Sequence, residues 1–284
     1  MAELYLRKVI LDIIPERGEG KQIEDLRIRF RCEKTNESNP NGSKIEIFNL
    51  APTTRSMVEG KNTRVKLQIG YLGVPQKSST GLNVTGTKGN VEGVFVGNVT
   101  KAVHKVEGGE KPDIITTLEV ADGGNRFRNA RLDKGYPPNT NLQQVYDDLI
   151  QELGLGKGAI KGIPDKQYSN GLTLSGLVRD HLDTLSKANK LEWSIQDETL
   201  QIIPQQEGAT TSFVDLNPDT GLIGSPSKTD KGVEFNSLIQ PKLRPGALVK
   251  LTSRFVTGTF KVRKVVHEGD SHQGDFLSKC EATK

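Results

Sequence analysis

Residues 267–275, HEGDSHQGD, hold two histidines and three acidic residues within nine positions. The histidines are His267 and His272, and the acids are Glu268, Asp270 and Asp275. Two imidazoles and a carboxylate could bind zinc or iron. Such a site needs neighbours that fix the imidazoles, and a polar turn rarely supplies them. The stretch lies between two alternating segments, and Gly269 and Gly274 suit the positive φ of a turn. We therefore predict a solvated hairpin turn and no metal site.

A glycine- and lysine-rich stretch, GLGKGAIKG at residues 154–162, is the next candidate for binding chemistry. Phosphate-binding loops follow a strand, open a helix and keep the GxGxxG or Walker spacing. This stretch has neither spacing, and it follows a segment with helical periodicity. We predict no nucleotide and no other cofactor here.

Ser175, in LTLSGL, is the serine to compare with a hydrolase nucleophile. It lacks the GxSxG pattern of a nucleophile elbow. His181 follows six positions later in a predicted helix, so the two side chains do not share a face. We interpret Ser175 as a helix cap and His181 as a surface histidine.

Three carboxylates, Asp147, Asp148 and Glu152, cluster on the polar side of a predicted amphipathic helix. A glycosidase needs two carboxylates on either side of a bond, and these can come from distant parts of a chain. The sequence therefore does not exclude such a pair elsewhere. We interpret this cluster as a solvated helix face.

Three arginines alternate with apolar residues in RIRFRC, at positions 27, 29 and 31. Small barrels that bind single-stranded nucleic acid combine such cations with aromatic side chains on which bases stack. Aromatic residues make up only 5% of this chain, and its phenylalanines fall mostly on apolar faces. The net charge of +4 permits nucleic acid as a partner without requiring it. We expect no specific nucleic-acid binding.

The cysteines and the N-terminal sequence indicate the compartment in which the protein is made. Cys32 and Cys280 are the only cysteines, and they are far apart in the chain, so no CxxC motif or thiolate-rich zinc site is present. Residues 1–20 lack the apolar core and cleavage site of a signal peptide, and no stretch reaches the ~18 apolar residues of a membrane helix. We expect synthesis in the cytoplasm and no membrane partner.

The elements that would position these residues are mostly strands. Period-two alternation, as in Leu26, Ile28, Phe30 and Cys32, predicts half-buried strands over most of residues 4–122. Residues 51–60 predict a short helix, and residues 74–90 a long exposed loop or flexible hairpin. We predict that residues 1–122 form a small antiparallel β-barrel.

The pattern changes at residue 123. Leu142, Val145, Leu149 and Leu153 have helical spacing, with Thr140 or Asn141 as a cap and Gly154 as the stop. A second helix is predicted from Leu174, Leu177, Val178, Leu182 and Leu185, with Thr173 or Ser175 as its cap. A hairpin with a tight turn at residues 196–198 follows. Residues 123–204 are thus expected to form an α/β insert of two helices and a hairpin.

Residues 205–284 return to strands after a loop-rich region that reaches residue 247 and contains one predicted strand, GVEFNSLI. Three alternating segments, ALVKLTSRF, GTFKVRKVVHEG and GDFLSKCEA, complete the chain. We predict a second antiparallel β-barrel. The expected fold class is therefore mainly β with an α/β insert and two small antiparallel β-barrel domains.

No catalytic constellation emerges, but an ordered series of phrases resembles a known family. KIEIFNLAPTTRSMVEGKNTRVKLQIGY resembles the opening module of baseplate hub proteins of phages with contractile tails. VEGVFVGNVTKAVHKVEGGEKPDIITTLEVADGG is similar to the next hub segment, and residues 139–155 and 172–204 are similar to its α/β insert. PGALVKLTSR and GTFKVRKVVHEGDSHQGDFLSKCEA are similar to its closing barrel. The resemblance covers nearly the whole chain and extends to the N-terminal hub part of type VI secretion spike proteins and to contractile bacteriocins.

The resemblance implies a structural protein of the virion, located in the tail baseplate, with no enzymatic activity. Such hubs form homotrimeric rings in which each chain supplies two similar barrels. The ring adapts a six-fold tail tube to a three-fold central spike, and DNA passes through its lumen on ejection. Lumen-facing groups should not bind DNA tightly. Barrel edge strands and loops such as 74–92 would contact neighbouring copies.

The implied partners are further copies of the chain, a central spike protein, the tail tube or its initiator, the baseplate wedge proteins and a tape-measure protein. We expect the spike to be a separate chain and assembly to occur in the host cytoplasm. In this family the hairpin that contains His267, Gly269, Asp270 and Gly274 would be structural. We thus expect no catalytic, cofactor-binding or metal-binding residue.

Two other functions remain open from sequence. One is a barrel protein that binds single-stranded nucleic acid, which salt-sensitive oligonucleotide binding would favour. The other is a cell-wall hydrolase at the tail tip, which clearing of purified peptidoglycan would favour.

Overall fold

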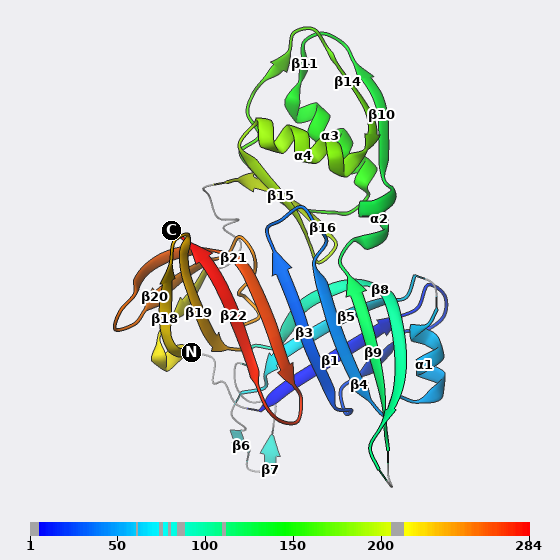
Figure 1. Cartoon of the computed structure of the whole chain (residues 1–284), viewed down its shortest axis with the longest axis vertical. Coiled ribbons are helices and arrows are strands. Elements are labelled where there is room, and N and C mark those ends of the chain that lie inside the picture. The colour runs from blue at the N-terminus through cyan, green and yellow to red at the C-terminus, as the bar shows by residue number, and fades with distance from the viewer. Residues whose placement is uncertain are drawn as a thin grey trace.

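Alternating strands form two β units, joined through one sheet, in the computed structural model of the chain (Figure 1). The structure describes residues 6–60, 62–73, 76–78, 81–83, 89–109, 112–205 and 213–284. The first β unit comprises β1 (Arg7–Ile14), β2 (Lys21–Ile23), β3 (Ile28–Thr35), β4 (Gly42–Phe48), α1 (Pro52–Val58), β5 (Arg64–Tyr71), β8 (Glu92–Glu107) and β9 (Asp113–Ala121). A separate hairpin, β6 (Gln76–Ser78) with β7 (Gly81–Asn83), branches from it.

The core of the first β unit follows the predicted alternation. In β3, Ile28, Phe30 and Cys32 are buried and the arginines between them point outward. Their apolar partners come from β1, β4, β5 and β9, and two come from the far end of the chain, Ile239 and Phe276. The Phe276 ring meets Phe30 edge-on, with 5.8 Å between the ring centroids.

The second β unit comprises β17 (Phe213–Leu216), the 3-10 helix η1 (Pro218–Thr220), β18 (Leu222–Thr229), β19 (Gly232–Leu238), β20 (Leu248–Thr252), β21 (Thr257–Asp270) and β22 (Phe276–Thr283). It has its own apolar core, built around residues such as Leu216, Val249 and Val265. β19 to β22 match the predicted strands. β17 and β18 lie in the region for which we predicted only one strand, and β18 contains Gly224 and Pro226, which weaken a strand pattern.

The prediction of two closed barrels is wrong. One 13-stranded sheet runs in the order β18-β19-β22-β21-β3-β4-β9-β8-β5-β1-β2, with β20 on β21 and β17 on β20. No ladder between described strands closes either unit on itself. In the first unit, β3 pairs with β21, from Lys264–Thr35 to Asp270–Arg29, and not with β1 or β2 at the other end of that unit. In the second unit, the outer strands β17 and β18 do not pair with each other, so the described strands of both units form one open sheet.

The insert rises from one end of this sheet (Figure 1). It comprises α2 (Gly124–Asn129), β10 (Arg131–Tyr136), β11 (Thr140–Asn141), α3 (Leu142–Leu153), β12 (Gly156–Ile160), β13 (Gln167–Tyr168), β14 (Leu172–Leu177), α4 (Val178–Ala188), β15 (Leu191–Gln196) and β16 (Thr199–Pro204). The predicted ends of α3 are confirmed: the Asn141 side chain accepts a hydrogen bond from the Gln143 N–H, and Gly154 ends the helix at φ 64°. Its apolar stripe and that of α4 form a third core.

The predicted start of the second helix is wrong. Residues 172–177 form β14, which pairs antiparallel with β10, and the helix begins only at Val178. Gly176, at φ 134° opposite Leu132, adopts a conformation that other residues rarely reach. Neither Thr173 nor Ser175 caps the helix, because the Val178 N–H donates to the Ala130 carbonyl instead. None of the helices in the described ranges is long and apolar enough to cross a membrane.

Candidate functional site

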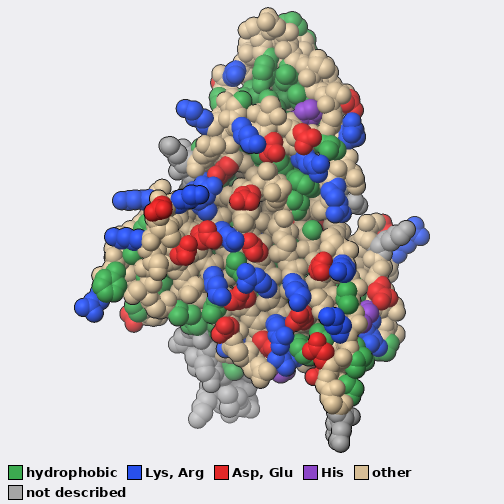
Figure 2. All heavy atoms as spheres, viewed as in Figure 1, with side chains coloured by type: hydrophobic (Ala, Val, Ile, Leu, Met, Phe, Trp, Pro, Cys, Tyr) green, Lys and Arg blue, Asp and Glu red, His purple; other side chains and the backbone are tan. Residues whose placement is uncertain are grey.

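One face of the sheet carries charged side chains across both β units, and we name it the ionic face (Figure 2). Because side chains alternate along a strand, Arg29 and Arg31 of β3 lie on the opposite face from Phe30. Strand pairing brings their neighbours to the same face: Asp270 lies opposite Arg29, and Glu268 opposite Arg31. The ionic face comprises Arg27, Arg29, Arg31, Glu33, Lys44, Glu46, Lys101, Glu119, Lys264, Glu268, Asp270, Lys279 and Glu281.

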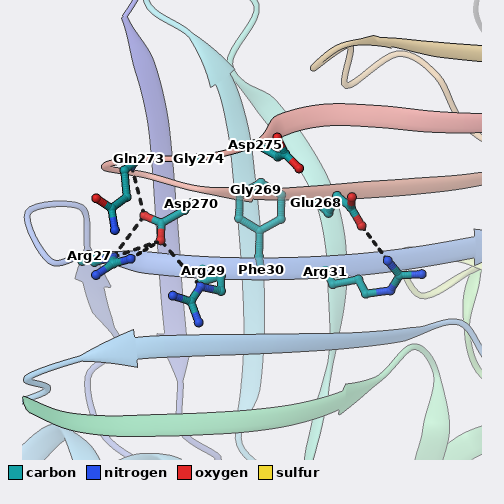
Figure 3. A pocket seen from close by; sticks show the side chains of 10 residues that line it. All are labelled: Arg27, Arg29, Phe30, Arg31, Glu268, Gly269, Asp270, Gln273, Gly274 and Asp275. Carbon is teal, nitrogen blue, oxygen red and sulfur yellow. Dashed lines mark hydrogen bonds and ion pairs between the residues drawn. The ribbon is translucent and has the colours of Figure 1, made fainter. Parts of the chain in front are cut away.

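Arg27 and Asp270 form a pair with two hydrogen bonds on the ionic face (Figure 3). The Arg27 Nε and Nη2 atoms donate to Asp270 Oδ2 over 2.9 and 2.8 Å. Asp270 Oδ1 also accepts the His272 N–H of the β21–β22 turn. Burial pushes the pKa of Asp270 upward, but the bonds from Arg27 and from the turn outweigh it and hold that pKa below its usual value. The pair therefore fixes the turn against β3.

The other cations on this face also meet carboxylates. Arg29 lies 3.1 Å from Glu46, and Arg31 lies 2.5 Å from Glu268. Further pairs join Lys279 to Glu268, Lys264 to Glu33, Lys44 to Glu46 and Lys101 to Glu119. Exposed pairs like these contribute little to stability, roughly 0–1 kcal/mol each. Their effect is electrostatic: positive charge is matched locally, so a phosphate backbone meets no continuous row of unpaired cations.

A shallow groove of about 380 Å³ lies on the ionic face beside this turn (Figure 3). Arg27, Arg29 and Arg31 line one side, and the β21–β22 turn with Gln273 and Asp275 lines the other. Three arginines with flanking acids could hold a polar group. The groove contains no nucleophile beside a base, because its carboxylates are occupied by the arginines or lie in the turn.

The prediction that His267 lies in a solvated turn is wrong. His267 belongs to β21, with 1% of its surface exposed, and its ring points into the protein. Nε2 lies 3.2 Å from the Leu243 carbonyl, which can only accept, so Nε2 carries the hydrogen. Nδ1 then accepts from the Ser278 hydroxyl, 2.8 Å away, and that hydroxyl accepts from the Gln240 N–H. Burial, with Lys34 nearby, lowers the pKa of His267 to about 3, so the imidazole is neutral.

His272 does lie in the exposed turn, where its Nδ1 is 2.9 Å from the Ser271 hydroxyl. The two histidines are therefore not brought together. Gly274 has the predicted positive φ of 70°, but Gly269 does not, because it still lies in β21 opposite Phe276. In the part of the chain that the structure describes, no three His, Cys, Asp or Glu side chains converge as metal ligands.

The remaining sequence candidates form no catalytic arrangement among the described residues. The Ser175 hydroxyl donates to Asp133 over 2.5 Å and lowers the pKa of that carboxyl, to which His181 of α4 adds a weaker electrostatic contribution. The serine thus bonds to a carboxylate and not to the imidazole. Asp148 pairs with Lys134 at 2.7 Å, and this hydrogen bond lowers the pKa of Asp148. Asp147 lies 3.9 Å from Lys157, and Glu152 is exposed. The GLGKGAIKG stretch ends α3 and forms β12, which pairs in parallel with β16.

Sequence reasoning missed a charged cluster around the buried side chains of Lys34 and Asp122, where the insert meets both β units. We name Lys34, Asp122, Asp197 and Arg244 the junction cluster. Lys34 Nζ lies 2.6 Å from Asp197 Oδ1, and only 1% of the Lys34 side chain is exposed. Arg244, from the second β unit, lies 3.5 Å from the other Asp197 oxygen and also donates to the Gly93 carbonyl.

The Asp122 side chain binds the backbone of the β15–β16 turn. Its two carboxylate oxygens accept the N–H groups of Asp197 and Glu198, at 2.7 and 2.8 Å. Those two turn residues both have positive φ, 54° and 60°, as a tight hairpin turn requires. Burial, partly offset by Lys34, raises the pKa of Asp122 to about 6. The turn itself was predicted, but no sequence signal pairs it with Lys34 or Asp122.

Comparison with solved structures defines the class of protein. The fold matches a 43 kDa tail protein of prophage MuSo2 from Shewanella oneidensis, with a TM-score of 0.65, 10% identity, and coverage of 98% of this chain and 97% of that one. A tail protein from Neisseria meningitidis matches with a TM-score of 0.64, 8% identity, and coverage of 99% and 97%. An E. coli component of the type VI secretion system matches with a TM-score of 0.62, 11% identity, and coverage of 96% and 76%. The chain thus has the fold of phage tail proteins and their secretion-system counterparts.

The family follows from the sequence. The family model of the baseplate hub gp41 matches residues 8–282, and the chain belongs to that family. No curated protein sequence matches the chain. The predicted resemblance to baseplate hubs and to type VI secretion proteins is confirmed, and the chain is a structural component of a phage tail baseplate.

Proposed function

We propose that this hub protein assembles as a homotrimeric ring that adapts a six-fold tail tube to a three-fold spike in a contractile tail, with DNA passing through its lumen. One observation carries the proposal: the ionic face spans both β units, which the β3–β21 ladder joins. A ring lining needs a broad polar surface of this kind.

The pairing of charges on the ionic face fits passage of DNA. Cations on a channel wall attract phosphates, and a row of unpaired ones would retain the DNA. Arg27, Arg29 and Arg31 each have a carboxylate within 3.1 Å. The face therefore combines hydration with low affinity for a polyanion.

The presence of two β units in one chain fits the change of symmetry. Each unit has its own apolar core, so three chains would offer six β units around the ring. Under this proposal the domains are residues 1–122, 123–204 and 205–284. The insert would lie outside the six-part ring, since its core is separate from both units.

The partners follow from position in the baseplate. They would be two further copies, the central spike, the tail tube or its initiator, wedge proteins and the tape-measure protein, with assembly in the host cytoplasm. The protein would act without catalysis, without cofactors, and without membrane or specific nucleic-acid binding.

Light scattering over a range of protein concentrations tests this proposal. A mass of three times the 31.1 kDa of one chain is the expected result. A stable dimer, or tight oligonucleotide binding at physiological salt, would contradict it. Mixing with the spike chain extends the test to a ring that closes only on its partner.

A further inference from the structure

A rigid turn at one end of the sheet exposes an aromatic ring and an arginine side by side. The turn joins β20 to β21 and contains Arg254 and Phe255. Phe255 is 66% exposed, between the buried residue Val256 and the exposed Arg254. The guanidinium carbon of Arg254 lies over the Phe255 ring, 5.4 Å from the ring centroid. We name Arg254 and Phe255 the knob.

The knob is held in place by its own turn. The Ser253 hydroxyl donates to the Val256 carbonyl over 2.8 Å and accepts the Val256 N–H over 3.0 Å. Val256 itself belongs to the core of the second β unit. A large ring on a preorganised turn loses little conformational freedom on binding, and aromatic residues and arginine dominate binding hot spots. Within the described chain no carboxylate pairs with Arg254.

A hollow of complementary chemistry lies between α1 and the β1–β2 turn. It measures about 520 Å³ and includes the apolar side chains of Pro15 and Met57 on its wall. Glu16 and Glu19 line it together with one cation, Arg17, so carboxylates outnumber cations. Ile14, next to Pro15, is an exposed large hydrophobic residue. We name this feature the α1 hollow.

The knob and the α1 hollow lie at opposite sides of the molecule. Figure 1 has the β20–β21 turn at the left edge of the sheet and α1 at the right edge. One chain therefore cannot fill its own hollow with its own knob. A ring of identical subunits needs two different complementary surfaces, placed apart on each copy.

We propose that the knob of one copy docks into the α1 hollow of the next copy around the ring. Phe255 packs against Pro15 and Met57, and Arg254 pairs with Glu16 or Glu19. The inference rests on the ring of the proposed function and names the surfaces that close it. A second copy is the occupant because each copy carries both halves of this complementary pair.

Mass measurements on matched variants test the contact. Phe255→Ala should raise the concentration of half-assembly at least about tenfold, as loss of an aromatic anchor does. Phe213→Ala is the control, because Phe213 belongs to the same β unit and is 59% exposed but lies outside the knob. Arg254→Glu should weaken assembly, and adding Glu16→Arg and Glu19→Arg should restore it. An unchanged mass for Phe255→Ala, or equal effects of the two phenylalanine variants, would overturn the inference.

Disulfide cross-linking detects the same contact between copies even if the trimer is weak. Arg254→Cys combined with Glu19→Cys should give covalent dimers and trimers on mild oxidation, whereas either single variant should give no trimer. The native thiols of Cys32 and Cys280 are buried and add little background. If the wild-type protein is a trimer but the double-cysteine variant does not cross-link, the proposed knob contact is wrong and the proposed ring stands. A wild-type protein that never forms trimers, alone or with the spike, would remove the ring itself.

Discussion

The two β units are joined to each other in one way and the insert is joined to them in another. Between the units, β3 and β21 share a ladder of backbone hydrogen bonds, and Phe276 of the second β unit packs into the core of the first β unit. Between the insert and the units, the β15–β16 turn meets the buried junction cluster. Backbone pairing spreads its energy over many residues, whereas a buried ion pair depends on each partner. The insert should therefore be sensitive to single substitutions at its junction.

The largest expected effect comes from His267, which lies in β21, the strand that joins the two β units. Its pKa is about 3 in the folded protein against about 6.5 unfolded, so its contribution to stability is full above pH 6.5 and lost as the pH falls toward 3. The loss approaches roughly 5 kcal/mol over that range. His267→Gln, which can still donate to the Leu243 carbonyl, should flatten this part of the profile. Urea unfolding at a series of pH values measures it, and identical slopes for both proteins would contradict the assignment.

At the junction, Asp197→Asn should cost about 3 kcal/mol or more. Asparagine keeps the shape and tolerates positive φ, but it leaves Lys34 without its paired charge in a buried place. Hydrogen exchange should show loss of protection in α3, α4 and β15 before β3 and β21. The neighbouring variant Glu198→Gln is the control, since its pair with Arg64 is partly exposed and should matter by less than about 1 kcal/mol. Equal loss of hydrogen-exchange protection in the insert and in the sheet would contradict the difference between the two kinds of attachment.

Asp122 should show the opposite pH dependence to His267. Its pKa is raised to about 6, so its contribution is full below the unfolded value near 3.8 and is lost as the pH rises through 6. The difference corresponds to about 3 kcal/mol. Asp122→Asn should remove this decline while keeping one acceptor for the turn. If the variant keeps the wild-type profile between pH 4 and 7, the titration belongs to another group.

The smallest expected effect lies inside the insert, away from the junction. Asn141→Ala removes the bond to the Gln143 N–H at the start of α3 and should cost about 1 kcal/mol. Hydrogen exchange of the first turn of α3 measures it, with Gln143→Ala as the control for the exposed neighbour. If α3 loses protection by this amount while β15 and β16 stay protected, the stability of the helix does not depend on how the insert is attached to the β units.

Local patterns predicted local structure well in this chain. Alternation in 26–32 predicted a half-buried strand, and the caps at Asn141 and Gly154 predicted both ends of α3. The second helix begins later than predicted because Leu172 and Leu174, two residues apart, have the spacing of one strand face. Pairing with β10, which has only a weak strand pattern, decided the outcome.

Features that depend on distant partners were not predictable. A histidine two residues before a glycine looks like part of a turn, yet the long β21 carries His267 into the protein, where Ser278 and Leu243 bind it. Open sheet and closed barrels share the same strand pattern, and only the pairing of β3 with β21 distinguishes them. Lys34 and Asp197 lie in separate segments, so their pairing at the junction has no local signal.

The β3–β21 ladder also has a consequence for synthesis. Arg27 and Asp270, which flank that ladder, are 243 positions apart in the chain. At about 5–20 residues per second, a ribosome needs roughly 10–50 s to travel from one to the other. During that interval β3 presents an uncovered backbone edge, and the core beneath Phe30 lacks Phe276. Nascent hub chains on neighbouring ribosomes of one messenger are therefore exposed to mutual strand pairing until β21 has been made.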